Sequence, residues 1–222
     1  MTHRYALYDL DKTVLRHASF TPFLIFAARR RSRLRVLLLP VWLLAMAGYK
    51  LGLYSRGALK QFGLQLMVGR LANDAQARAL GRAFAGQILP DWIAPGAATA
   101  IEADRKAGCE LWLVTAAMGF YAEEIGRRLA FDRVIATGHA LTGEGRLLLR
   151  GDNCYGAAKV ARMEEALEVD GVQRSESAVA FYSDSASDAP LFDWADRAVL
   201  VNGSASARRK AARHGWETTS FY

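Results

Sequence analysis

Two carboxylates lie two positions apart near the start of the chain. Asp9 and Asp11 follow the apolar run RYALY, and Thr13 comes two positions later. Adjacent like charges repel each other, and proteins tolerate them where a divalent cation supplies the balancing charge. An acidic pair in a surface turn has no such meaning, so the interpretation depends on what accompanies it.

Three later segments bring groups that complement this pair. LWLVTAA contains Thr115, NCYGAAKV contains Lys159, and AVAFYSDSASDAP contains Asp184 and Asp188. Together the segments supply carboxylates for a hard cation and for nucleophilic or acid–base work. They also supply a hydroxyl and an ammonium group for an anion.

The elements needed to position these groups alternate along the chain. Residues 4–11, 109–117, 134–138, 178–185 and 198–202 are typical of buried strands, and 118–130, 157–169 and 205–216 have helical periodicity. A hairpin is expected over 139–150, around the turn TGEG. This pattern predicts an α/β fold with a parallel sheet, and such a sheet binds ligands at the carboxyl ends of its strands.

A long insert separates the first expected strand from the second. Residues 16–94 are almost free of strand signals, and Asn73 or Asp74 could cap a helix there. Pro90 and Pro95 with Gly96 indicate the return to the core. We therefore expect a core made of residues 1–15 and 95–222, and a helical domain over 16–94.

The order and spacing of these motifs resemble the haloacid dehalogenase superfamily of phosphatases. Its first motif, DxDxT, corresponds to residues 9–13, its second to Thr115, its third to Lys159 and its fourth to Asp184 with Asp188. The resemblance implies a Rossmann-like core with a helical C1 cap inserted after the first strand. That cap position is typical of subfamily IB, the branch that contains phosphoserine phosphatase.

The resemblance also implies roles for the residues. Asp9 would attack phosphorus and form an aspartyl-phosphate, and Asp11 would act as general acid and base. Mg²⁺ would be held by Asp9, Asp184 and the backbone carbonyl of Asp11, with Asp188 supporting the metal shell or the lysine. Thr115 and Lys159 would bind the phosphoryl oxygens.

Lys12 departs from the family pattern, which usually has a small residue between the second aspartate and the threonine. Lysine adopts left-handed backbone angles less readily than glycine, and its charge adds to the field at the phosphate site. Two interpretations remain open: a preference for a more anionic substrate, or a lysine that points to solvent without a role.

Positive charge is concentrated in the insert. The chain has 29 basic and 22 acidic residues, yet no acid stands between Asp11 and Asp74, where eleven basic residues occur. The remainder therefore carries 18 basic against 22 acidic residues. Any anionic partner implied by the net charge of +7 should touch the insert, above all the cluster Arg29, Arg30, Arg31, Arg33 and Arg35.

An apolar run follows this arginine cluster. Residues 36–49 are uncharged, but 14 residues of helix rise about 21 Å, which is less than the roughly 30 Å of a bilayer core. With Pro40, Gly48 and Gly52, the run favours a re-entrant or interfacial segment at the cytoplasmic face of a membrane. The pattern resembles the insert of phosphatidylglycerophosphatase C. The alternative is that the run forms the core of the cap.

These observations predict a Mg²⁺-dependent phosphomonoesterase. The leading substrate is an anionic lipid phosphate such as phosphatidylglycerophosphate, and the alternative is a soluble small molecule. Phosphoserine is disfavoured, because the family position for an amine-binding acid is Ala18 here. A nucleic-acid-binding module lacks interleaved aromatic residues, so no nucleic-acid partner is expected, and a catalytically inactive scaffold would not need all four motifs.

Cysteine usage and the N-terminus bear on the compartment. Cys109 and Cys154 show neither a disulfide framework nor zinc-ligand spacing, and the first residues do not resemble a signal peptide. A cytoplasmic enzyme is expected, either free or at the membrane surface.

Overall fold

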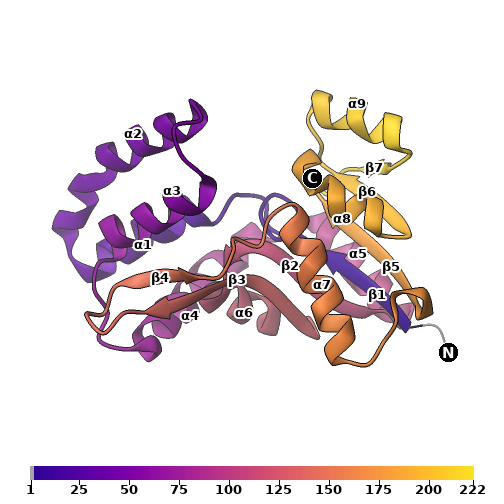
Figure 1. The fold of residues 1–222 in the computed structure, drawn as a ribbon, viewed down its shortest axis with the longest axis horizontal. Coiled ribbons are helices and arrows are strands. Elements are labelled where there is room, and N and C mark those ends of the chain that lie inside the picture. The colour runs from indigo at the N-terminus through magenta and orange to yellow at the C-terminus, as the bar shows by residue number, and fades with distance from the viewer. Residues whose placement is uncertain (1–2) are drawn as a thin grey trace.

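A seven-stranded sheet forms the centre of the computed structural model, which describes residues 3–222. The strand order is β4-β3-β2-β1-β5-β6-β7, and only the β3–β4 pair is antiparallel. The strands are β1 (His3–Tyr8), β2 (Glu110–Met118), β3 (Arg133–Leu141), β4 (Leu147–Arg150), β5 (Ser177–Ser183), β6 (Arg197–Val201) and β7 (Glu217–Thr219). The predicted Rossmann-like α/β fold is confirmed (Figure 1).

The central strand β1 is buried on both faces. Tyr5 and Leu7 belong to one hydrophobic cluster, whereas Ala6 and Tyr8 belong to the other. This two-residue alternation is what a pleated strand imposes. Because β1 pairs with β2 on one side and β5 on the other, its carboxyl end lies between the ends of those two strands.

Helices cover both faces of the sheet. The hydrophobic cluster on one face includes residues of α4 (Asp74–Trp92), α5 (Pro95–Lys106) and α6 (Gly119–Arg128). The cluster on the other includes residues of α7 (Ala157–Val169), α8 (Ala189–Trp194) and α9 (Ala205–His214). Two single turns, η3 (Arg174–Glu176) and η4 (Ala186–Asp188), flank β5. The result is a three-layer arrangement with the sheet in the middle.

The regular elements between residues 16 and 94 are all helical. They are α1 (Phe20–Arg31), η1 (Arg33–Leu38), α2 (Leu39–Lys50), α3 (Arg56–Gly63), the π-helix η2 (Leu64–Val68) and α4. In Figure 1, α1, α2 and α3 form a lobe beside the sheet. Asn73 caps α4, since its side chain accepts a hydrogen bond from the backbone N–H of Gln76 at 3.1 Å.

Helix α4 lies against the core helix α6. A Cβ atom on Gly81 would lie 2.0 Å from the carbonyl oxygen of Phe120, so the two backbones meet where glycine stands. Phe84 of the same helix packs against Phe23 of α1. Helix α4 therefore connects the lobe to the core, and the boundary at residue 94 stays a prediction.

Several element boundaries differ from the sequence prediction. Pro90 lies inside α4, which continues to Trp92, so only Pro95 begins a new helix. The strand predicted over 134–138 continues to Leu141 because it pairs with β4. Helix α9 ends at His214, where Gly215 adopts left-handed angles with φ +74°. Short α8 and β7 were not predicted, because packing rather than periodicity stabilises elements of this length.

Candidate active site

The first and fourth motifs meet at the carboxyl ends of β1 and β5. The backbone N–H of Asp9 donates to the carbonyl of Tyr182 at 2.9 Å, and the backbone N–H of Asp184 donates to Thr13 Oγ1 at 2.9 Å. Thr13 thus ties the loop after β1 to the end of β5. One cavity of about 200 Å³ opens here, and all six predicted site residues line it: Asp9, Asp11, Thr115, Lys159, Asp184 and Asp188.

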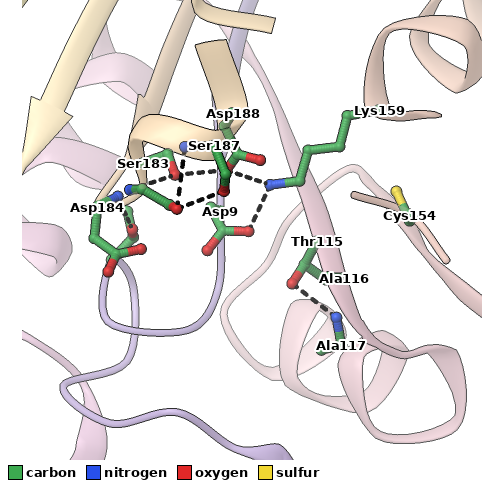
Figure 2. A network of polar contacts seen from close by, with 12 residues as sticks. Asp9, Thr115, Ala116, Ala117, Cys154, Lys159, Ser183, Asp184, Ser187 and Asp188 are labelled. Carbon is green, nitrogen blue, oxygen red and sulfur yellow. Dashed lines mark hydrogen bonds and ion pairs between the residues drawn. The ribbon is translucent and has the colours of Figure 1, made fainter. Parts of the chain in front are cut away.

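Lys159 is the central cation of the cavity. Its Nζ atom lies 2.7 Å from Asp9 Oδ1 and 2.8 Å from Asp188 Oδ2, and its side chain is only 1% exposed (Figure 2). The two carboxylates raise the pKa of Lys159 against the opposing effect of burial, so the lysine keeps its proton. The structure thus brings residues 9, 159 and 188 into direct contact.

Asp188 is held from two sides. Ser183 Oγ donates to Asp188 Oδ2 at 2.7 Å, on the same oxygen that Lys159 contacts. The other oxygen, Asp188 Oδ1, is buried and has no hydrogen-bond partner within residues 3–222. A buried carboxylate oxygen without a partner is costly, and such atoms commonly mark the position of an ion or an ordered water.

Thr115 lies on an irregular part of β2. The pairing of β2 with β3 shifts register between Val114 and Met118, as in a β-bulge. Thr115 is buried at the cavity wall, and its Oγ1 accepts a hydrogen bond from the backbone N–H of Ala117 at 3.1 Å (Figure 2). Because that bond uses the oxygen only as an acceptor, the hydroxyl proton stays available to a bound anion.

Asp11 lines the same cavity but has different hydrogen-bond partners from Asp9 and Asp188. Its Oδ1 accepts a hydrogen bond from the backbone N–H of Ser19 at 2.8 Å, and it forms no hydrogen bond or ion pair with Lys159. Burial raises the pKa of Asp11, while Ser19 opposes the rise. A raised pKa suits a carboxyl group that must give and take a proton.

The remaining electrostatics fit a divalent cation. Burial, opposed by Lys159 and reinforced by Asp188, raises the pKa of Asp9 to about 7, and burial raises that of Asp184 to about 6. Within residues 3–222, no three His, Cys, Asp or Glu side chains form a metal cluster. The expected set of metal ligands needs only two carboxylate side chains, because the backbone carbonyl of Asp11 supplies its third oxygen. Such an all-oxygen set with remaining positions for water suits Mg²⁺.

Lys12 adopts the left-handed conformation with φ +61°, where glycine would be unstrained. Its side chain is exposed, and its carbonyl accepts a hydrogen bond from Asn202 Nδ2 at 3.2 Å. Lys12 also lines the mouth of the cavity. The backbone at Lys12 therefore adopts a conformation that glycine would reach without strain, although the side chain is that of lysine.

Two basic residues of α3 reach the site and were not predicted as site residues. Lys60 is buried and donates to Asn153 Oδ1 at 2.6 Å and to the carbonyl of Ala116; burial lowers its pKa to about 8. Arg56 lines the cavity with its guanidinium 4.5 Å from the ring centre of Tyr155. Their four-residue spacing places them on one helix face, but only the fold shows that this face covers the cavity.

The comparison with known families now bears directly on this geometry. The family model for haloacid dehalogenase-like hydrolases matches residues 6–193. This chain belongs to the haloacid dehalogenase-like hydrolases. The sequence resemblance to that family is therefore confirmed, whereas the resemblance of the insert to phosphatidylglycerophosphatase C is not.

Relatives refine the placement of this hydrolase. Phosphoserine phosphatase SerB1 of Mycobacterium tuberculosis is 28% identical over 224 residues, covering 97% of this chain and 70% of the relative. A Bordetella pertussis protein of unknown function superposes with a TM-score of 0.85 at 26% identity, covering 100% of both chains. A phospho-aspartyl intermediate analogue of phosphoserine phosphatase superposes with a TM-score of 0.65 at 14% identity, covering 100% of this chain and 95% of that one. The hydrolase is thus a phosphatase of this family, and its fold is shared with phosphoserine phosphatase.

Proposed function

We propose that this phosphatase hydrolyses phosphate monoesters through a covalent intermediate on Asp9, with Mg²⁺ as cofactor. The observation that carries the proposal is the convergence of six predicted side chains on one cavity at the end of β1. The structure of phosphoserine phosphatase described above as a phospho-aspartyl intermediate analogue supports the same mechanism, because it shares the fold.

The first half-reaction transfers the phosphoryl group to the protein. A carboxylate oxygen of Asp9 attacks phosphorus, and the bond from phosphorus to the ester oxygen breaks. Asp11 gives its proton to the departing oxygen, so the alcohol leaves neutral. The second half-reaction reverses these roles: Asp11 takes a proton from water, the water oxygen attacks phosphorus, and inorganic phosphate leaves Asp9.

Charge that develops on the phosphoryl oxygens needs donors in fixed positions. Lys159 supplies an ammonium group beside Asp9, and Thr115 supplies a hydroxyl from the neighbouring strand. Both side chains are buried, so they keep their positions through the reaction and act in a region of low dielectric.

Asp9, Asp184 and the carbonyl of Asp11 are the groups that would hold the cation. When bound, Mg²⁺ neutralises phosphoryl charge and lets the nucleophilic carboxylate approach an anion. The buried Oδ1 atom of Asp188 has no hydrogen-bond partner among residues 3–222 and would orient a water molecule bound to the cation.

The cavity lining favours a substrate whose leaving group is uncharged or anionic. Its four carboxylates are those of the motifs, Ala18 stands at the wall, and Arg56 and Lys12 supply positive charge. An amine such as that of phosphoserine would find no free carboxylate among the described lining residues. We propose an anionic lipid phosphate, phosphatidylglycerophosphate first, with a soluble phosphate ester as the second candidate.

The size of the cavity sets how a lipid would bind. About 200 Å³ holds a phosphorylated head group but not acyl chains, so the chains would stay outside. Phosphate release with Mg²⁺ tests the proposal, comparing phosphatidylglycerophosphate in mixed micelles with soluble esters that include phosphoserine. A hundredfold preference in kcat/KM for the lipid supports the lipid substrate, whereas higher values for soluble esters reject it. Activity that persists unchanged in EDTA rejects the magnesium requirement.

A further inference from the structure

Within the lobe of α1, α2 and α3, the stretch from η1 to α3 exposes an unusual amount of apolar surface. Eleven large hydrophobic side chains of the described chain are exposed, and nine of them lie between residues 34 and 62. These nine define the apolar surface of the lobe: Leu34, Leu37, Val41, Leu43, Leu44, Leu51, Leu53, Tyr54 and Phe62. A concentration of this kind marks an interaction surface rather than the scattered exposure of an ordinary surface.

Helix α2 contributes much of this exposed apolar surface. It is apolar around its whole circumference except for its last residue, Lys50, yet only Trp42 is buried. Leu44, on the exposed side, is 73% exposed. Figure 1 shows α2 at the outer edge of the lobe, away from the sheet. A helix that is hydrophobic on all sides is normally enclosed, so α2 requires a cover that residues 3–222 do not provide.

The helix is well formed despite its glycine and proline residues, so its exposure is not a sign of local unfolding. Pro40 stands in the first turn, where the missing N–H costs nothing. A Cβ atom on Gly48 would lie 2.7 Å from the hydroxyl of Tyr54, so glycine lets the following loop fold back onto α2. The exposed apolar surface is therefore formed by ordered structure. Among residues 3–222, no helix combines the length and the apolar character needed to cross a bilayer.

The charges around this surface indicate what covers it. Arg29, Arg30 and Arg33 on one side and Lys50 on the other are exposed, and no acidic residue occurs between Asp11 and Asp74. A second copy of the chain would bring identical positive rims together. A bilayer with anionic head groups instead places negative charge against the rim and apolar chains against the leucines.

We propose that this surface docks on an anionic lipid bilayer, with the leucines in the acyl boundary and the arginines among the phosphates. The loop that carries Leu51, Leu53 and Tyr54 leads within two residues to Arg56, which lines the active-site cavity. Docking therefore brings the cavity to the membrane surface. The docking itself does not rest on the proposed function; its use for a lipid substrate does.

The structure selects which arginines can be tested. Arg35 Nη1 donates to the carbonyl of Leu66 at 2.8 Å, and Arg31 donates to the carbonyl of Arg70, so both hold the fold. The side chains of Arg29 and Arg33 make no hydrogen bond or ion pair with any residue from 3 to 222. Replacing these two by glutamine removes charge from the rim without removing a structural contact.

Co-sedimentation with vesicles of phosphatidylcholine and phosphatidylglycerol tests the docking, with pure phosphatidylcholine vesicles as the reference. The apolar variant Leu37→Ser/Leu44→Ser/Leu53→Ser and the charge variant Arg29→Gln/Arg33→Gln are compared with control variants elsewhere on the surface. Val169→Ser, 79% exposed on α7, is the apolar control, and Arg209→Gln/Arg213→Gln on α9 is the charge control.

We expect the wild-type chain to bind the anionic vesicles and both test variants to bind at least tenfold more weakly. Two lost charges correspond to about 30-fold weaker binding, from about 1 kcal/mol per charge near the surface. Both control variants should bind as wild type, and hydrolysis of a soluble phosphate ester should be unchanged in all variants. That last readout separates failure of docking from failure of the proposed function.

Two results would overturn the docking proposal. Wild-type protein that stays in solution with anionic vesicles would exclude a bilayer as the cover. A wild-type dimer in light scattering that the leucine variant converts to a monomer would assign the surface to a second copy of the chain.

Discussion

The buried position of Lys159 predicts a large effect of removing its charge. Its ammonium lies between Asp9 and Asp188, whose side chains are 11% and 3% exposed. Replacing Lys159 by methionine keeps most of the side-chain volume but leaves two buried carboxylates without a cation. Removal of one partner from a buried ion pair costs about 3–5 kcal/mol, so Lys159→Met should lower the free energy of unfolding by that amount.

The assay is urea and thermal unfolding in EDTA, so that no cation replaces the ammonium. The expected loss corresponds to a fall in Tm of roughly 6–20 °C for a chain of this size. The control is Lys106→Met, because Lys106 is 75% exposed and pairs with Glu102 only at 3.5 Å. That surface pair should contribute less than about 1 kcal/mol.

A second variant separates the effect of charge from the effect of packing. Adding Asp188→Asn to Lys159→Met removes one of the two unpaired carboxylates, so the double variant should regain at least about 1 kcal/mol. Neither variant should release phosphate at a measurable rate. A loss below 1 kcal/mol in Lys159→Met, or a double variant less stable than the single one, would refute the account of these carboxylates as a repelling buried pair.

Three further predictions concern positions outside the catalytic groups. Gly81→Ala should destabilise the protein by more than about 2 kcal/mol, because the added Cβ meets the α6 backbone at 2.0 Å. The control Gly86→Ala on the same helix should be neutral or stabilise the protein by up to about 1 kcal/mol, because the atom nearest to its added Cβ, at 3.2 Å, is at the end of the flexible Arg128 side chain. If the two alanine variants changed the free energy of urea unfolding equally, the close contact between α4 and α6 at Gly81 would be refuted. Glu124 has its pKa lowered from 4.5 to about 2 by hydrogen bonds from two arginines, so its contribution is complete above pH 4.5 and disappears as the pH falls toward 2. Because solvent screens the exposed arginines, we expect Glu124 to contribute about 1 kcal/mol to the free energy of unfolding. Glu124→Gln should remove this contribution, and with it that part of the dependence of Tm on acid pH. Lys12→Gly should raise stability by about 0.5–1 kcal/mol by relieving the positive φ; lower stability in thermal unfolding would mean that the lysine side chain stabilises the loop.

The core and most of the site could be predicted because both depend on local sequence patterns. The first and fourth motifs follow the buried strands β1 and β5, and parallel strands bring their carboxyl ends to one edge. Asp9 and Asp184, 175 positions apart in sequence, could therefore be placed together from the pattern alone.

The contributions of the insert could not be predicted in the same way. Lys60 and Arg56 lie on a helix whose orientation over the cavity depends on packing between α3, α4 and the sheet. The apolar run 36–49 had been expected either in lipid or in the core of the cap. The structure shows that most of it is packed on one side and exposed on the other, which periodicity could not predict because apolar residues occur on every face.

The central claim is that Asp9 is the nucleophile, and phosphate release by Asp9→Asn tests it most directly. The amide can still accept the hydrogen bond from Lys159 but cannot attack phosphorus as a carboxylate does. With Mg²⁺ and the best ester of the panel, the variant should fall at least about a thousandfold in kcat while its Tm stays within a few degrees of wild type. Phosphate release at near-native rates by a folded Asp9→Asn protein would contradict the account.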